Sequence, residues 1–560
     1  MNIYDHGYLR LRFYHLLSIS LSAVALTLLG MQTCGQVNSK KNVGLENSET
    51  TLLNSFYASG QIQEIHLSME PAQLDRLKHA LPERIYVPAT FRWRNVTLAH
   101  VGIRYKGNSS SHPDQKHKRS FLIKFNEFEK GQRFLGLRRV ALDNGVQFGS
   151  LFSECLITDI LRDQGIHASR SNYAKLLLNG NYLGIYVNVE RLDQSFLKHH
   201  FSTQEGLLYK VDLGGRGSNL QFIGKDTALY ADTFEAKSDQ AENGRISLVD
   251  FIQMINQLPE HQFETLIEES MEWEAFLRTT ATMLFSGAFD QLTGWNPHNY
   301  YLYFQPESRQ WHYLPWDLDV GFADKAFGKI PVIDGWHAAW PVPGGPPRPL
   351  LERIVRHPEI LKRYRELADE ILEEYFRPEV LISKLDALYA LIREDLSKDS
   401  FPHRRITNPS DTSYDDIVDS IKAFIQRRYE TARVQLDHPG VRPDPPEVPR
   451  QPQEQPRPGT RKDGVPTGLR IDSVSASGVS LAWTDNATGE VGHIVQRSSG
   501  EQEKHFANLI GQPGDHIQFA EDFHVRSGQT FSYRVYALFA APLGPEGTVP
   551  SEVVTVTIPR

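Results

Sequence analysis

The chain has 560 residues and a mass of 63.8 kDa, too long for a single ordinary hydrophobic core, so we expect two or more domains. Hydrophobic residues at 40% and charged residues at 23% are typical of a folded soluble protein. The formal net charge of -8, without a dense basic stripe of interleaved aromatic residues, argues against a nucleic-acid partner.

The N-terminal segment has the organisation of a secretory signal. Arg10 and Arg12 precede an apolar run from Leu16 to Met31, and small or polar residues follow. A transmembrane helix is the alternative, but the run is short for a bilayer and has no basic flank behind it. We therefore predict a signal peptide over residues 1–35 and an exported protein that is extracellular, periplasmic or lipid-anchored at the cell envelope.

Cys34 directly follows the apolar run. In a bacterial lipoprotein the cysteine at this place is acylated, so a lipid anchor is one prediction and the only membrane attachment that we expect. The preceding residues, Met31-Gln32-Thr33, fit the lipoprotein pattern poorly, and ordinary cleavage nearby is an equal alternative. Residues 36–55 are polar and predict a flexible tether. Because Cys155 is the only other cysteine, the chain is not a disulfide scaffold.

The region 56–437 begins with strands and ends with helices. Tyr173–Leu178 and Tyr182–Val189, joined by Asn179-Gly180-Asn181, predict a β-hairpin. The other predicted elements are the strands Ile62–Leu67, Val101–Tyr105 and Ser120–Phe125, and the helices Ser153–Gln164, Pro358–Leu396 with a break at Pro378, and Tyr414–Leu436. Strands followed by helices predict an α+β domain.

The stretch GNSS, Gly107 to Ser110, allows two interpretations. It lacks the spacing of a P-loop and of the kinase glycine-rich loop, which favours a turn over a phosphate loop. The basic residues that follow it, Lys116, Lys118 and Arg119, would attract an anionic ligand and keep the phosphate-loop interpretation open.

A second hairpin is predicted further along the chain. Asn299–Phe304 and Gln310–Leu314 are apolar-aromatic runs joined by a short polar loop, and two such runs are expected to pair. The outer ends of this hairpin would bring Asn299 near Asp317.

Asp317 and Asp319 lie two residues apart in a segment that we expect to be extended. Both carboxylates would then face one side, and Trp316 and Leu318 would point into the core. An unpaired carboxylate among apolar neighbours costs on the order of several kcal/mol. A hard divalent cation bound by these oxygens and by Asn299 is favoured over the alternative, a helix N-cap with a salt bridge.

The same parts occur in the same order in protein kinases. There a loop carries an aspartate base and then a metal-binding asparagine, a short hairpin follows, and a metal-binding aspartate comes last. By this order Asp290 is the catalytic base, Asn299 or Asn296 the metal-binding amide and Asp317 the metal-binding carboxylate. The interval from Asp290 to Asn299 is longer than in kinases, so this loop requires an insertion relative to theirs.

The ordered set of motifs resembles the CotH family, the spore coat protein H-like atypical kinases. The resemblance covers about Ile62 to Phe322, and the matching stretches are IRYKGNSS at Ile103–Ser110, KRSFLIKF at Lys118–Phe125, LLLNGNYLGIYVNVERLD at Leu176–Asp193, GLLYK at Gly206–Lys210, HNYYLY and PWDLDVGF. It implies an atypical protein-kinase-like domain that phosphorylates Ser or Thr of proteins with ATP and Mg²⁺ or Mn²⁺.

The resemblance also implies roles for four further residues. Lys118 or Lys124 would neutralise the ATP phosphates, and the sequence does not choose between them. Glu154 is a candidate partner for that lysine, the alternative being a glutamate on an exposed helix face. Glu190, which follows an apolar strand, would lie at the hinge near the adenine.

Two further regions complete the chain. Residues 438–465 are rich in proline and charge and predict an extended, semi-rigid linker. Residues 466–560 consist of short alternating runs separated by turns, which predict an all-β immunoglobulin-like sandwich. Trp483 and Tyr533 resemble the core aromatic residues of a fibronectin type III module, and a module of this kind would act as a spacer or bind a ligand.

Three hypotheses for function follow from these predictions. The first is an exported Ser/Thr kinase that acts on a secreted or surface protein. The second is a cell-envelope scaffold that keeps a kinase-like fold without turnover, which the signal sequence and the appended sandwich favour. The third, a metal-dependent hydrolase of phosphoesters or glycans, is disfavoured by the kinase-like order of the lysine, glutamate, asparagine and aspartate.

Overall fold

The computed structural model describes residues 49–81, 83–107, 118–145, 150–201, 203, 205–211, 214–294, 297–326, 330–331, 336–343, 347–399, 410–442, 458–475, 478–499, 506–513, 518–522, 525, 528–539 and 546–559. The chain divides into two compact units, residues 1–54 and 55–560. In the first unit residues 49–54 are helical, so the flexible tether predicted for 36–55 is wrong over that stretch. The predicted signal peptide, with Cys34, lies outside the described residues.

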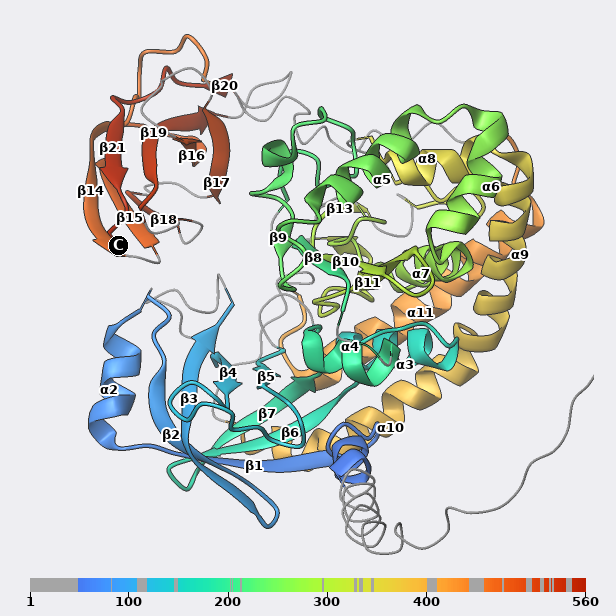
Figure 1. Cartoon of the computed structure of the whole chain (residues 1–560), viewed down its shortest axis with the longest axis horizontal. Coiled ribbons are helices and arrows are strands. Elements are labelled where there is room, and N and C mark those ends of the chain that lie inside the picture. Colours follow the sequence, from blue (N-terminus) through green and yellow to red (C-terminus); the bar gives the residue numbers. More distant parts are fainter. Residues whose placement is uncertain are drawn as a thin grey trace, which may run out of the picture. The chain divides into compact units, whose positions relative to one another are not determined.

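Seven strands of the second unit form a closed barrel in the order β1-β2-β3-β4-β5-β7-β6, drawn in blue and green in Figure 1. Neighbouring strands pair antiparallel except β1 and β6, which close the barrel in parallel. The strands are β1 (Ile62–Ser68), β2 (Val87–Trp93), β3 (Val96–Lys106), β4 (Ser120–Lys124), β5 (Arg139–Asp143), β6 (Ser171–Leu178) and β7 (Asn181–Val189), with helix α2 (Pro71–His79) between the first two.

The β6–β7 hairpin confirms the turn predicted from the sequence. Asn179 and Gly180 have φ angles of 50° and 81°, the left-handed conformation that a two-residue turn of this type requires at both positions. Leu178 pairs with Asn181, so the hairpin is as tight as predicted.

Aromatic side chains form a core cluster in the barrel region. The ring centroids of Phe56, Phe91, Trp93 and Phe125 lie 4.8 to 5.5 Å from that of Phe134, in edge-on or tilted contacts. Such geometries are the favoured ones for aromatic pairs and add to the stabilisation from burial.

A second sheet has the strand order β11-β10-β8-β9. Its strands are β8 (Leu207–Val211), β9 (Glu235–Ala236), β10 (Tyr300–Gln305) and β11 (Gln310–Pro315). The β10–β11 pair is the second predicted hairpin, with Gln305 opposite Gln310. Helix α3 (Ser153–Asp163) also agrees with the sequence prediction.

Helices make up most of the remaining part of this region. They are α4 (Gln194–Phe201), α5 (Arg245–Gln257), α6 (Glu260–Ser270), α7 (Trp273–Ser286), α8 (Pro349–Arg356), α9 (Pro358–Tyr375), α10 (Pro378–Leu396) and α11 (Tyr414–Asp437). The break at Pro378 and the last helix are confirmed. Among the helices of the described residues, none is long and apolar enough to cross a bilayer. Helices together with sheets agree with the predicted α+β class.

The C-terminal region contains two antiparallel sheets, as predicted for a sandwich. Trp483 and Tyr533 are buried in one shared core. One sheet consists of β14 (Thr467–Ser475), β15 (Gly478–Thr484) and β18 (Phe519–Asp522); the other consists of β16 (Glu490–Ser499), β17 (Ala507–Pro513), β19 (Thr530–Phe539), β20 (Glu546–Gly547) and β21 (Val554–Thr557). The fibronectin type III assignment stays a resemblance.

A buried ion pair joins the end of α10 to the barrel. The Lys118 ammonium, at the entrance to β4, lies 2.7 Å from the Asp399 carboxylate, and both side chains are at most 1% exposed. The ammonium also donates to the Ile185 carbonyl at 2.5 Å. A Cβ at Gly184 would collide with the Asp399 carboxylate, so only glycine fits at that position.

We predict that breaking this pair destabilises the fold strongly. Lys118→Met or Asp399→Asn should each lower the free energy of unfolding by about 3–5 kcal/mol, because each leaves an uncompensated buried partner. The measurement is urea unfolding followed by tryptophan fluorescence. The Lys118→Met/Asp399→Leu double variant should lose less than the sum of the single losses.

The matched control is the neighbouring exposed pair Lys398–Glu394, whose side chains are 54% and 88% exposed. Lys398→Ala should leave the free energy of unfolding nearly unchanged, because water and salt screen an exposed pair. Equal losses in the Lys118 and Lys398 variants would contradict the role given to the buried pair.

Candidate functional site

Asp317 follows β11 at a point where the chain leaves the extended conformation. Its φ angle is 59°, and Leu318 and Asp319 form a turn, so the extended segment predicted here is wrong. Trp316 and Leu318 are buried, as predicted, with 4% and 1% of their surface exposed. The two aspartates nevertheless lie close enough for the charge of Asp317 to raise the pKa of Asp319, after the larger effect of burial.

The β10–β11 hairpin brings Asn299 to the same place. Its carbonyl accepts a hydrogen bond of 2.9 Å from the Trp316 amide. Its side-chain amide donates to the Asp290 carboxylate at 3.1 Å, and His298 Nε2 lies 3.1 Å from the same oxygen. The structure therefore brings the predicted base and the predicted metal-binding amide together, whereas Asn296 lies outside the described residues.

Glu154 is buried near the start of α3, with 3% of its surface exposed, so the exposed helix-face alternative is wrong. Its carboxylate accepts a hydrogen bond of 2.6 Å from the Leu318 amide. Burial raises the pKa of Glu154 to about 8, and the negative charges of Asp317 and Asp143 contribute. A hydrogen bond thus holds Glu154 against the aspartate segment, and the charge of Asp317 acts on its carboxylate there.

Five carboxylates share this region: Asp143, Glu154, Asp290, Asp317 and Asp319, named here the acid cluster. The pKa of Asp319 lies well above its ordinary value, first because of burial and then because the other four members are negatively charged. Crowded carboxylates that repel one another hold protons or bind cations.

The donor chemistry of the acid cluster fits a hard divalent ion such as Mg²⁺ or Mn²⁺. Within the part of the chain that the structure describes, no group of three or more His, Cys, Asp or Glu side chains is arranged to hold a metal by itself. Mg²⁺ is usually bound by one or two carboxylates together with waters and substrate phosphates, rather than by an all-protein cage. Asp317, Asp319 and Asn299 are the residues that could supply the protein ligands.

Lys106, at the end of β3, is a functional candidate that the sequence analysis missed. Its ammonium forms an ion pair with Asp143, and its charge lowers the pKa of Glu154 against the larger effects that raise it. The strand register explains the pairing: Lys106 lies opposite Ser120, and Phe121 lies opposite Leu142, which puts Asp143 in the same row. Nothing in the sequence reveals this register, because the three strands are separated by loops.

The two lysines proposed from the sequence lie elsewhere. The Lys118 ammonium forms the buried ion pair with Asp399. Lys124 forms an ion pair of 2.5 Å with Glu127, and its ammonium lies 5.4 Å from the centroid of the Tyr86 ring. The structure therefore does not bring either lysine into contact with Glu154.

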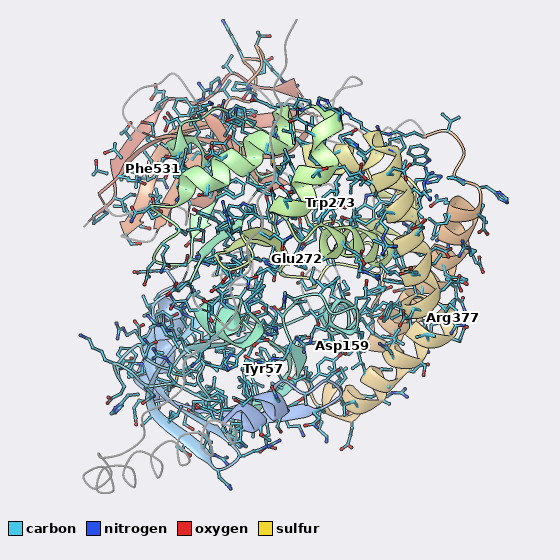
Figure 2. All side chains as sticks on the ribbon, turned by 45° about the vertical axis from the view of Figure 1, so that its right-hand side comes forward. Tyr57, Asp159, Glu272, Trp273, Arg377 and Phe531 are labelled. Carbon is cyan, nitrogen blue, oxygen red and sulfur yellow. The ribbon has the colours of Figure 1, made fainter. Side chains whose placement is uncertain are left out.

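Glu190 is held in a buried ionic network. Arg170 donates to both carboxylate oxygens, and His200 Nε2 lies 3.1 Å from one of them. Burial alone would raise the pKa of Glu190, but the hydrogen bonds and charges of His200 and Arg170 lower it to about 2. The Arg170 guanidinium also lies 4.9 Å from the ring centroid of Tyr57, which Figure 2 labels. The predicted adenine contact of Glu190 stays a prediction.

Comparison with known proteins gives one family and one curated relative. A family model described as CotH kinase protein matches residues 103–432. Inner spore coat protein H of Bacillus subtilis (strain 168) is 25% identical over 367 residues, which cover 65% of this chain and 94% of that protein.

Two solved structures that match this chain each cover less than a fifth of it. An FN3 domain of human collagen XX is 15% identical and covers 18% of this chain and 97% of its own, with a TM-score of 0.15. A myokine structure is 15% identical and covers 19% of this chain and 100% of its own, also with a TM-score of 0.15. Scores this low do not establish a shared fold.

The raised pKa of Glu154 predicts a pH-dependent stability in metal-free buffer. The folded-state pKa of about 8 exceeds the ordinary value of 4.5. The contribution of protonated Glu154 to the free energy of unfolding is therefore complete below about pH 4.5 and is lost as the pH rises towards 8. Glu154→Gln should reduce this loss, by roughly 1–3 kcal/mol at pH 8, since the amide carries no charge. Urea unfolding from pH 5 to about pH 8, with a chelator present, measures the effect.

The control is Glu366→Gln, at a side chain 50% exposed on α9. It should leave the pH dependence of the wild-type chain unchanged. A Glu154→Gln variant with the same pH slope as the wild type would show that Glu154 is not the titrating group.

Proposed function

This chain belongs to the CotH kinase protein family, and from that premise we propose that it is an exported, metal-dependent protein kinase. It would transfer the γ-phosphate of ATP to Ser or Thr of a secreted or surface protein, with Mg²⁺ or Mn²⁺. The relative in Bacillus subtilis bears the name of a spore coat protein, which supports a surface location for the acceptor.

The acid cluster is the observation that carries the proposal. Burial and mutual repulsion raise the pKa values of Glu154 and Asp319, so the cluster is costly to ionise unless a cation is added. A nucleotide bound with a divalent ion brings such a cation. A non-catalytic scaffold would gain nothing from buried carboxylates that are costly to ionise.

Asp317 and Asp319, with the amide oxygen of Asn299, would hold the ion. When bound, a divalent ion neutralises charge that develops on the transferred phosphoryl group. Glu154 would hold the aspartate segment in place, because its carboxylate accepts a hydrogen bond from the Leu318 amide, between the two aspartates.

Lys106 replaces Lys118 and Lys124 as the proposed phosphate-binding lysine. It projects from the end of a barrel strand, pairs with Asp143 and acts electrostatically on Glu154. Its side chain is 13% exposed, compared with 0% for that of Lys118, so Lys106 is the less buried of these two lysines. A compact ammonium on a fixed strand suits the charge of phosphate oxygens.

Asp290 would orient the acceptor hydroxyl and accept its proton. The Asn299 amide and His298 both contact one oxygen of its carboxylate, which fixes the orientation of the group before the acceptor arrives. Holding the acceptor and the phosphoryl group in line is the main source of rate in this chemistry.

Labelled ATP tests the proposal directly. The purified full chain, incubated with γ-labelled ATP and Mn²⁺, should label itself or an acidic model protein. Asp317→Ala and Lys106→Met should each lower the rate by about a hundredfold or more, because each removes a charge that acts on the phosphates.

Lys124→Met is the matched control, since Lys124 is also a barrel-strand lysine with a carboxylate partner. Its rate should equal that of the wild type. Loss of labelling in Lys124→Met with full labelling in Lys106→Met would reverse the lysine assignment. No label from the wild-type chain on either acceptor would favour the non-catalytic scaffold.

A further inference from the structure

Arg348 is a buried arginine directly before α8, with 1% of its surface exposed. Its Nε donates to the Leu292 carbonyl at 3.0 Å, and its Nη2 donates to the Gly294 carbonyl at 2.7 Å. Its Nη1 lies within 3.3 Å of the Pro347 carbonyl. The guanidinium thus bridges two points of the loop that carries Asp290.

That loop, Phe289 to Gly294, follows the C-terminus of α7 and has no strand or helix of its own. It folds back on itself: the Gly294 amide donates to the Gln291 carbonyl at 2.9 Å. A Cβ at Gly294 would collide with the Phe289 backbone, so this turn accepts only glycine. Buried carbonyls in such a turn need donors from elsewhere, and Arg348 provides two from one rigid fork.

A side chain of the loop itself makes a second contact that holds the loop. Gln291 is fully buried, and its amide donates to the Trp316 carbonyl at 2.8 Å. Gln291 therefore ties the loop to the segment that carries Asp317. Arg348 ties it to the helical region. The Asp290 carboxylate projects from a turn that is held at both of these points.

Placing a guanidinium here is costly. Burial lowers the pKa of Arg348 to about 10, although the nearby Tyr300 acts in the opposite direction. An apolar side chain would fill the same space without that cost, but it would leave the Leu292 and Gly294 carbonyls without these donors. The guanidinium therefore supplies two carbonyls of the Asp290 loop with donors that an apolar side chain lacks.

We propose that Arg348 is a positioning residue for Asp290. It fixes the loop that presents the carboxylate to the acceptor hydroxyl, and it touches neither the nucleotide nor the acceptor. The inference rests on the proposed function for its effect on turnover, whereas its effect on the loop itself is independent of turnover.

Arg353 offers a matched control on the same helix. It is 5% exposed, and it also bridges two carbonyls, those of Ile255 at 2.9 Å and Leu258 at 2.7 Å. These carbonyls lie at the end of α5, away from the Asp290 loop in sequence. Arg353 also forms an ion pair with Glu260 at 2.7 Å.

The experiment compares Arg348→Met with Arg353→Met in the full chain. Arg348→Met should lower kcat for transfer from labelled ATP by about a hundredfold with an unchanged KM for ATP, because the base is displaced while the nucleotide site is intact. Amide hydrogen exchange in residues 289–294 should be about tenfold faster in Arg348→Met than in Arg353→Met. Arg348→Lys, which keeps the charge but not the fork, should stay impaired, and it carries the test if Arg348→Met fails to fold.

Equal kcat in the Arg348 and Arg353 variants, or unchanged exchange in residues 289–294, would overturn the inference. A rise in the KM for ATP without a fall in kcat would also overturn it, since that pattern indicates a nucleotide contact. If the wild-type chain transfers no phosphate, the proposed function fails, and the exchange comparison alone decides whether Arg348 holds the loop.

Discussion

Glu154, Asp317 and Asp319 repel one another across a partly buried space, and the candidate site depends on that repulsion. Any one of these carboxylates, taken alone, could be explained as a helix N-cap or as a member of an ion pair. Here burial raises the pKa of Glu154 to about 8, with contributions from the charges of Asp317 and Asp143, and burial together with the neighbouring carboxylates raises that of Asp319 well above its ordinary value. A group of carboxylates that is costly to ionise without a cation is suited to bind one, and this supports the proposed metal-dependent phosphoryl transfer.

Other parts of the fold hold these carboxylates in their positions. The barrel register places Lys106 beside Asp143, and the β10–β11 hairpin returns the chain so that Asn299 contacts Asp290. Two buried cations support the framework: Lys118 joins the end of α10 to the barrel, and Arg348 holds the turn after α7 that carries Asp290. The family match extends to residue 432 and so includes most of the helical region.

Local patterns predicted the parts of the fold that local physics determines. The turn at Asn179 and Gly180, the two hairpins and the break at Pro378 all follow from backbone preferences or alternation. Helix α7 was missed because almost all of its residues are buried, so it lacks the polar face by which an amphipathic helix is recognised. The lysine assignment depends on contacts between segments far apart in the sequence: Lys118 meets Asp399 and Lys106 meets Asp143 only in the folded chain, and sequence spacing predicts neither contact.

We infer that the acid cluster and Lys106 together bind a nucleotide with its metal. The most direct measurement is the melting temperature of the full chain with ATP and Mn²⁺ together and with each alone. A ligand at about a hundred times its Kd adds roughly 2.7 kcal/mol to the folded state, so the pair should raise the melting temperature clearly, and the rise should vanish in Lys106→Met but persist in Lys124→Met. An unchanged melting temperature of the wild-type chain with ATP and Mn²⁺, or an equal rise in Lys106→Met, would contradict the account.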